Sequence, residues 1–134
     1  MQDPVNHTLG KARVSVKLVL IGSERYFGPG ICELLEKIDD SGSIQAAAKQ
    51  MNMSYTKAWK ILNRAEKEMN CRLITRMNGG KNGGSSSLTT DGRQAVAAFR
   101  EMEQRLQRES ERILAEYEGI LLPRPGAADR SECT

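Results

Sequence analysis

Two short helical segments separated by one abrupt break most strongly constrain the fold of this chain. The stretch GSIQAAAKQMNMSYTKAWKIL covers residues 42–62, and Ser43 and Ser54 are placed as N-caps of the two helices. Asn52 lies at the break, where Asn tolerates the left-handed backbone of a sharp turn. Two such short helices bury little surface alone. Small side chains, however, let two helices cross closely, and the pair carries five alanines: Ala46, Ala47, Ala48, Ala58 and Ala65. The stretch therefore predicts a rigid helix-turn-helix supported by a preceding helix over residues 31–42.

The flanking segments complete a winged helix-turn-helix domain over residues 13–89. Residues 13–21 alternate apolar and polar side chains with a period of two, which predicts a strand with one covered face, and residues 22–30 have turn chemistry. After the second helix, residues 71–77 and 87–90 predict the two strands of a wing, joined by a Gly- and Ser-rich loop. The predicted fold is mainly α, with a short N-terminal strand and a two-stranded wing.

A long C-terminal helix is predicted from about Asp91 to Gly119, with Thr89 or Thr90 as its cap. Its apolar residues recur at heptad-like spacing, at Ala95, Phe99, Met102, Leu106, Ile113, Tyr117 and Ile120. The wing and three short helices are too small to cover the whole stripe, so we expect a second copy of the helix to cover the remainder.

The predicted assembly is a twofold-symmetric homodimer. The side chains predicted to form its contact are Phe99, Met102, Leu106, Ile113 and Tyr117. Residues 90–122 are then a dimerisation helix, residues 1–12 a flexible N-terminus and residues 123–134 a disordered tail.

The net charge of +3 at pH 7 is unevenly distributed along the 134 residues. Residues 54–81 carry seven basic and two acidic side chains, whereas residues 31–53 and 90–122 each carry a net charge of −2. The basic stretch coincides with the second helix of the pair and the wing. A localised positive surface of this kind is typical of contact with phosphates.

The second helix also presents side chains that can bind base edges. These properties predict a recognition helix of about residues 54–69 in the major groove of double-stranded DNA, and a wing of about residues 72–89 on the backbone or in the minor groove. The residues predicted to contact DNA are Ser54, Tyr55, Thr56, Lys57, Lys60, Asn63 and Arg64 on the helix, with Arg76 and Lys81 on the wing. Trp59 is expected to pack inside the domain, with a direct DNA contact as the alternative.

Residues 14–118 resemble the winged helix-turn-helix domain of the molybdate-responsive regulator (ModE) family, a relative of the LysR-type DNA-binding domain. The resemblance rests on Phe27-Gly28-Pro29-Gly30, Gly42-Ser43-Ile44, Ser54-Tyr55 with Ala58-Trp59-Lys60, Gly79-Gly80-Lys81, and Leu88-Thr89 with Gly92. The chain departs from the family at Ser85-Ser86-Ser87, where the wing is usually glycine-rich. The resemblance implies a bacterial-type transcriptional regulator that binds DNA as a dimer on an inverted-repeat operator.

The resemblance does not imply molybdate sensing. Family members that sense molybdate carry a separate oxyanion-binding region after the DNA-binding domain. Because fifteen residues follow Gly119, we expect no molybdate site in this chain.

Catalysis is not expected. His7 is the sole histidine, and no group of Cys, His, Asp or Glu has the spacing of metal ligands, so we expect no enzyme, no metal and no cofactor. Residues 79–84, GGKNGG, do not form a P-loop, because Lys81 is followed by Asn82 instead of Ser or Thr. The alternative function is a protein–protein interaction module whose helix-turn-helix is structural.

The cellular setting is predicted from cysteines and hydropathy. The chain has three cysteines, Cys32, Cys71 and Cys133. An odd number of widely scattered cysteines is typical of free thiols in a reducing compartment. The sequence has neither an apolar run as long as a membrane span nor the pattern of a signal peptide. We therefore expect a soluble cytoplasmic protein.

Overall fold

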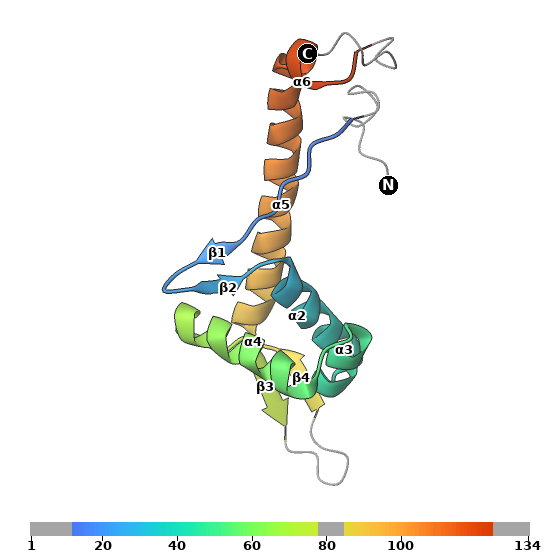
Figure 1. Cartoon of the computed structure of the whole chain (residues 1–134). Coiled ribbons are helices and arrows are strands. Elements are labelled where there is room, and N and C mark those ends of the chain that lie inside the picture. The colour runs from blue at the N-terminus through green and yellow to red at the C-terminus, as the bar shows by residue number, and fades with distance from the viewer. Residues whose placement is uncertain (1–11, 78–84, 125–134) are drawn as a thin grey trace. The chain divides into compact units, whose positions relative to one another are not determined.

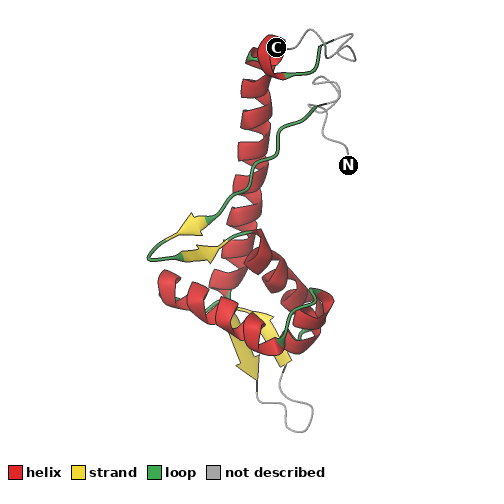
Figure 2. Ribbon diagram, in the orientation of Figure 1, coloured by secondary structure: helices red, strands yellow, loops and turns green. Residues whose placement is uncertain are grey.

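Helix α2 (Pro29–Ser41) contacts both helices of the helix-turn-helix and one strand of each small sheet (Figure 1). The structure is a computed structural model that describes residues 12–77 and 85–124. The other elements are β1 (Leu20–Ile21), β2 (Arg25–Phe27), α3 (Ile44–Gln50), α4 (Tyr55–Met69), β3 (Ile74–Met77), β4 (Ser85–Leu88), α5 (Thr90–Glu116) and α6 (Glu118–Leu121). The fold is mainly helical with small antiparallel sheets, as the sequence predicts (Figure 2).

The chain divides into two compact units. Residues 17–101 form the first, which holds the helix-turn-helix, both sheets and the beginning of α5. The second contains the rest of α5, α6 and the described residues 12–16. The predicted flexible N-terminus and C-terminal tail lie almost entirely outside the described residues, so these domain boundaries stay predictions.

The core of the first unit is formed by α2 together with small side chains from α3 and α4. Leu34, Leu35 and Ile38 of α2 have no exposed surface. The side chains of α3 and α4 that are buried beside them include Ala47, Ala48, Ala58 and Ala65. Because alanine projects little beyond the helix backbone, the three helices approach closely, as the alanine-rich pair predicts.

Polar side chains and left-handed residues set the helix ends as predicted. The hydroxyl of Ser43 accepts a hydrogen bond from Ala46 N–H, and that of Ser54 accepts one from Lys57 N–H, each at 3.0 Å. Asn52 turns the chain between α3 and α4 with φ of 57°. The predicted caps and the predicted sharp turn are therefore confirmed.

The long strand predicted over residues 13–21 is wrong for most of its length. Only Leu20 and Ile21 pair, and their partner is β2, which lies inside the segment predicted to be a turn. Alternation alone does not make a strand, because the backbone groups need a partner strand, and β2 is three residues long. Phe27 of β2 is buried in the core, which explains why this short strand forms.

The wing is confirmed as two antiparallel strands, β3 and β4, with Ile74 opposite Leu88 and Met77 opposite Ser85. The predicted bounds of the second strand, residues 87–90, are wrong: β4 begins at Ser85, inside the predicted loop, and ends at Leu88, and Thr90 already belongs to α5. Ser86 N–H donates to the carbonyl of Gly42 at 2.8 Å, which ties β4 to the end of α2. The predicted loop between the strands lies mostly outside the described residues.

Phe99 joins α5 to the core of the first unit. It is 2% exposed, and its ring centroid lies 5.2 Å from that of Phe27. Arg93 and Arg100 of α5 bind Asp39 and Glu36 of α2, each through two hydrogen bonds. Phe99 was predicted to face a partner helix, but it fills a space in its own chain, so it is unavailable for the dimer contact.

The second unit shows which face of α5 the N-terminal segment occupies. Gln107 donates to the carbonyl of Val14 at 2.6 Å and to a carboxylate oxygen of Glu111 at 2.8 Å, and Glu111 is 1% exposed. The long helix ends at Glu116, and after Tyr117 the short α6 follows. The predicted continuous helix to Gly119 is therefore interrupted near its end.

Gly92 provides a test of how α5 begins. A Cβ at this position would collide with the carbonyl oxygen of Leu73 and lie 3.3 Å from Leu88 Cβ. We expect Gly92→Ala to lower the free energy of unfolding by about 1–3 kcal/mol, although Ala favours helices by about 1 kcal/mol over Gly. Urea unfolding measures the difference. The control is Gly30→Ala in α2, where a Cβ meets nothing within 4 Å. Equal stability of the two variants would contradict the close contact between Gly92 and Leu73.

The ion pair between Glu36 and Arg100 makes the stability depend on pH. The hydrogen bond from Arg100 holds the pKa of Glu36 below its ordinary value of 4.5. A lowered carboxyl pKa stabilises the fold above pH 4.5, and the contribution is lost as the pH falls through the lowered pKa.

We therefore expect Glu36→Gln to cost about 0.5–1 kcal/mol at pH 7, because both side chains are more than one third exposed. The difference from the wild type should shrink as the pH falls below the ordinary carboxyl pKa. Thermal unfolding at several pH values measures it. Glu33→Gln, which removes the weaker contact with Lys37 at 3.6 Å, is the control and should show a smaller effect; the same loss in both variants would refute the special role of Glu36.

Candidate nucleic-acid interface

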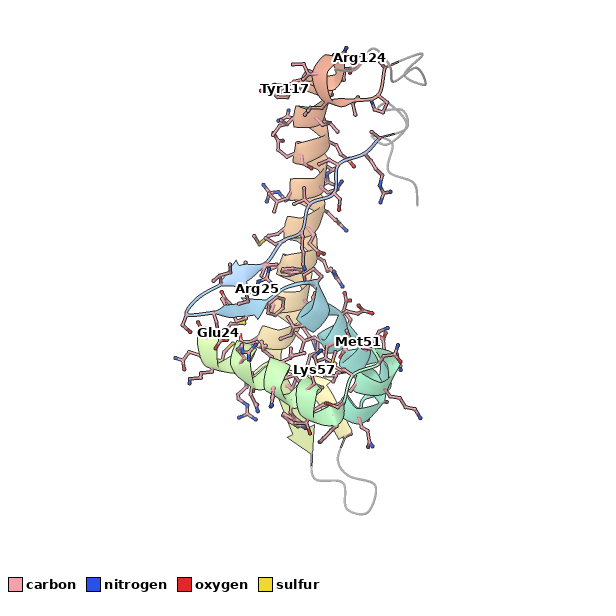
Figure 3. All side chains as sticks on the ribbon, in the orientation of Figure 1. Glu24, Arg25, Met51, Lys57, Tyr117 and Arg124 are labelled. Atoms are coloured by element: carbon pink, nitrogen blue, oxygen red, sulfur yellow. The ribbon has the colours of Figure 1, made fainter. Side chains whose placement is uncertain are left out.

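Helix α4 has one buried face and one polar outer face. Ala58, Leu62 and Ala65 are buried against the core, because they recur at helical spacing. The opposite face, here called the outer face, consists of exposed side chains from Thr56, Lys57, Lys60, Asn63, Arg64 and Lys67. Lys57 lies in the first turn of this helix (Figure 3).

Both acidic residues of α4 are turned away from the outer face and hydrogen-bonded on its flanks. On one flank, Glu66 accepts the N–H groups of Leu73 and Ile74, at 2.8 and 3.3 Å, just where the wing begins. On the other flank, Glu68 accepts the hydroxyl and the N–H of Ser23 in the β1–β2 hairpin. The outer face of α4 therefore carries lysine and arginine without a carboxylate among them.

The same hydrogen bonds fix the charge of Glu68. Donation by the Ser23 hydroxyl, and then by its N–H, lowers the pKa of Glu68. The carboxylate is thus ionised at neutral pH and binds the hairpin. Glu66 also lies 3.8 Å from Arg72, so its charge has a cationic neighbour beside the wing.

The structure separates the residues predicted to contact DNA into two groups. Thr56, Lys57, Lys60, Asn63 and Arg64 lie on the outer face. The two residues at the start of the helix have structural contacts: the Ser54 hydroxyl caps α4, and the ring of Tyr55 meets that of Trp59 edge-on, with centroids 6.0 Å apart.

Trp59 is partly buried and packs against the core. This position agrees with the prediction that its main contribution is packing. Arg64 reaches across to Glu24 of the hairpin at 3.5 Å, and both side chains are about half exposed, so this ion pair is weak.

The two residues predicted on the wing are less well described. Arg76 lies in β3, with its Cα opposite that of Ser86. Lys81 lies outside the described residues.

Sequence reasoning missed Lys67 as a member of the outer face. It follows Lys60 by seven residues and Arg64 by three, and it is exposed. Helical spacing from these two residues was the signal that could have found it.

Within residues 12–77 and 85–124, no three His, Cys, Asp or Glu side chains are grouped as metal ligands. None of the helices described has both the length and the apolar character needed to cross a membrane.

Comparison with known proteins bears on the same region. Residues 32–93 match the model of the bacterial regulatory helix-turn-helix proteins of the LysR family. The match begins in α2, contains α3, α4 and the wing, and ends in the first turn of α5.

Residues 32–93 form a LysR-type helix-turn-helix domain.

Relatives of this LysR-type domain carry the name ModE. The chain is 37% identical over 90 residues to "Molybdenum transport protein ModE" of Herbaspirillum seropedicae, which is 67% of this chain and 32% of that protein. It is 42% identical over 65 residues to "Transcriptional regulator ModE" of Haemophilus influenzae, covering 48% and 26%. It is 35% identical over 71 residues to "DNA-binding transcriptional dual regulator ModE" of Escherichia coli K12, covering 53% and 27%.

The alignments with these three relatives cover about a third or less of their length. The LysR-type family is described as regulatory, and the relatives from Haemophilus influenzae and Escherichia coli are named as transcriptional regulators. They support the expected class of protein and the resemblance to ModE.

Proposed function

We propose that the protein is a transcriptional regulator that binds double-stranded DNA with α4 in the major groove. The outer face of α4 is the observation that carries this proposal, because it combines exposed cations with hydrogen-bonding side chains and excludes both carboxylates of the helix. The LysR-type domain and the relative named as a DNA-binding regulator support the same function.

The outer face divides between base and backbone contacts. Thr56 and Lys60 lie in the first two turns of α4, where recognition helices usually reach base edges. Lys57, Arg64 and Lys67 provide positive charge at the sides and toward the end of the helix, where phosphates of the two strands pass. We propose base contacts for the first group and phosphate contacts for the second.

The wing extends the proposed interface. Glu66 fixes the start of β3 to α4, so the wing has a defined position beside the recognition helix. We propose that Arg76 and Lys81 contact the backbone or the minor groove, and this stays a prediction from the sequence.

The second unit supports a homodimer. Met102, Leu106 and Ile113 fall on one face of α5, and Tyr117, which follows the end of the helix, continues their spacing; between 41% and 48% of each residue is exposed. The described part of the N-terminal segment, residues 12–16, bonds to Gln107 on a different face of the helix from this apolar stripe. We propose that the same stripe of a second copy covers it.

A twofold dimer would present two recognition helices to one side of the DNA. The proposed operator is then an inverted repeat, with half-site centres about 34–36 Å apart on successive major grooves. Phe99 is excluded from the proposed contact because the core of its own chain buries it.

Salt dependence tests the outer face. We expect Lys57→Ala, at a proposed phosphate contact, to weaken DNA binding and to lower the slope of log K against log salt by about 0.9 for each phosphate that the variant no longer neutralises. Lys60→Ala, at a proposed base contact, should instead cost about 1–3 kcal/mol at one base pair. Mobility shifts over a salt series with matched and mutated sites separate the two. Lys37→Ala on α2 is the control; unchanged binding in Lys60→Ala would favour a structural helix-turn-helix in a protein–protein interaction module.

Sedimentation tests the dimer. We expect Leu106→Glu to give a monomer with unchanged helicity and greatly weakened operator binding, because a carboxylate in the apolar contact would be buried without a partner. Gln104→Glu is the matched control, since it adds the same charge on the opposite face of α5. A wild-type protein that sediments as a monomer at micromolar concentration and still binds a half-site tightly would disprove the dimer.

A further inference from the structure

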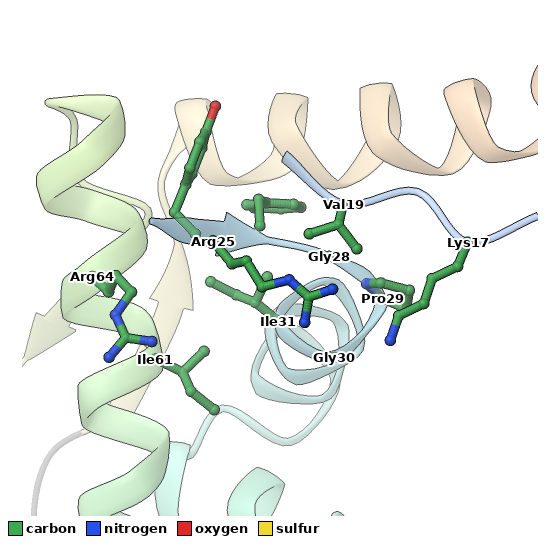
Figure 4. A pocket seen from close by; sticks show the side chains of 11 residues that line it. Lys17, Val19, Arg25, Gly28, Pro29, Gly30, Ile31, Ile61 and Arg64 are labelled. Carbon is green, nitrogen blue, oxygen red and sulfur yellow. The ribbon is translucent and has the colours of Figure 1, made fainter. Parts of the chain in front are cut away.

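A pocket of about 310 Å³ lies between the β1–β2 hairpin, the first turn of α2 and one flank of α4 (Figure 4). It belongs wholly to the first unit. Basic side chains from three separate segments line it: Lys17, Arg25 and Arg64. Apolar side chains, among them Val19, Ile31 and Ile61, form another part of its wall. A concave site of this size with apolar walls and a few convergent polar groups is typical of small-molecule binding.

The positive charge of the pocket is poorly neutralised by the protein. Within the described residues, neither Lys17 nor Arg25 makes an ion pair, and Arg64 has only its 3.5 Å contact with Glu24. In Figure 4, the amino group of Lys17 and the guanidinium group of Arg25 both lie beside the start of α2, at Pro29 and Gly30. Arg64 lines the pocket from α4, beside Ile61 and apart from these two cations.

The start of α2 adds to the same field. No side chain caps this helix, Pro29 occupies its first turn, and no acidic residue lies there. The first main-chain hydrogen bond of the helix runs from Cys32 N–H to the Gly28 carbonyl at 3.1 Å. The N–H groups of Gly30 and Ile31 come before it in the chain, so they belong to the first turn, whose N–H groups have no carbonyl partner within the helix. Such N–H groups, together with the helix dipole, favour an anion. In this pocket, the N–H groups and the helix dipole add to the positive field of the three basic side chains that line it.

The pocket is distinct from the outer face of α4. Glu66 marks the flank of α4 that meets the wing, whereas Arg64 and Glu68 meet the hairpin on the other flank. The pocket lies on the hairpin flank, and Arg64 is the one residue that belongs to both the outer face and the pocket lining.

We propose that this pocket binds a small organic anion. Its phosphate or carboxylate head would lie between Lys17 and Arg25 at the start of α2, Arg64 would add positive charge from the α4 wall, and its apolar body would pack against Val19, Ile31 and Ile61. A charge-assisted hydrogen bond is the strong kind for this purpose, and arginine binds both head groups through two parallel N–H groups. The inference does not depend on DNA binding, because the ligand would be held by the pocket alone.

Titration of the full chain with phenyl phosphate and with benzoate tests the proposal, with phenol as the uncharged probe. Calorimetry and amide chemical shifts in NMR should show saturable binding of at least one anion and none of phenol. The preferred anion then distinguishes a phosphate from a carboxylate ligand. The shifted amides should lie in the hairpin and the first turn of α2.

Three variants locate the site by different physical means. Arg25→Gln removes one charge and should weaken binding about tenfold or more. Gly30→Leu fills the pocket without changing charge, since the space around its Cβ is open, and should abolish binding. Glu24→Gln frees Arg64 from its ion pair and should tighten binding up to about fivefold.

Two variants outside the pocket are the matched controls. Arg105→Gln removes one positive charge and Gly119→Leu adds the same side chain as Gly30→Leu, and both should leave binding unchanged.

Two results would overturn the proposal. One is the absence of saturable binding of both anions, or equal losses in the pocket variants and their controls. The other result concerns DNA. Arg25→Gln would lower the slope of log K for DNA binding against log salt by about 0.9, whereas Gly30→Leu would leave that slope unchanged, and neither phenyl phosphate nor benzoate would bind. The cations would then belong to the DNA-contact surface and not to a ligand site.

Discussion

The close approach of α3 and α4 to α2 is the constraint on which the rest of the structure depends. It is possible because alanines fill the contact, and Ala47, Ala58 and Ala65 have no exposed surface. A larger side chain there would force the helices apart, at a cost of about 1–3 kcal/mol. Since α4 buries one narrow stripe, its remaining surface is free for polar side chains. The packing that stabilises the domain thus also determines which residues of α4 face outward.

Charge is distributed by the same architecture. Glu66 and Glu68 accept hydrogen bonds on the two flanks of α4, one from the wing and one from the hairpin. Each carboxylate therefore fastens a neighbouring segment and leaves the outer face to cations. On the other side of α2, Arg93 and Arg100 of α5 bind acidic residues, so these positive charges are neutralised within the domain. The basic surface of a chain with modest net charge is thereby concentrated on α4.

Helical spacing and capping residues predicted the helix-turn-helix well, because these signals act within one or two turns of the chain. Asn52 is an example, since its left-handed backbone is a local property. Signals that depend on distant partners were less reliable: residues 13–21 alternate as a strand does, yet only their end finds a partner. Spacing placed Phe99 on an apolar stripe but did not reveal that Phe27 covers it. Likewise, the outward side chains of α4 were predictable, whereas the hydrogen-bond partners of its two glutamates were not.

We propose that two copies of α4, related by a twofold axis, read DNA through their outer faces. Selection of bound sequences from a random pool of double-stranded DNA, using the full chain, tests it most directly. We predict an enriched inverted repeat whose half-site centres lie about 10–10.5 base pairs, or one helical turn, apart. Recovery of unrelated sequences, or of a single half-site without its inverted copy, would contradict the claim.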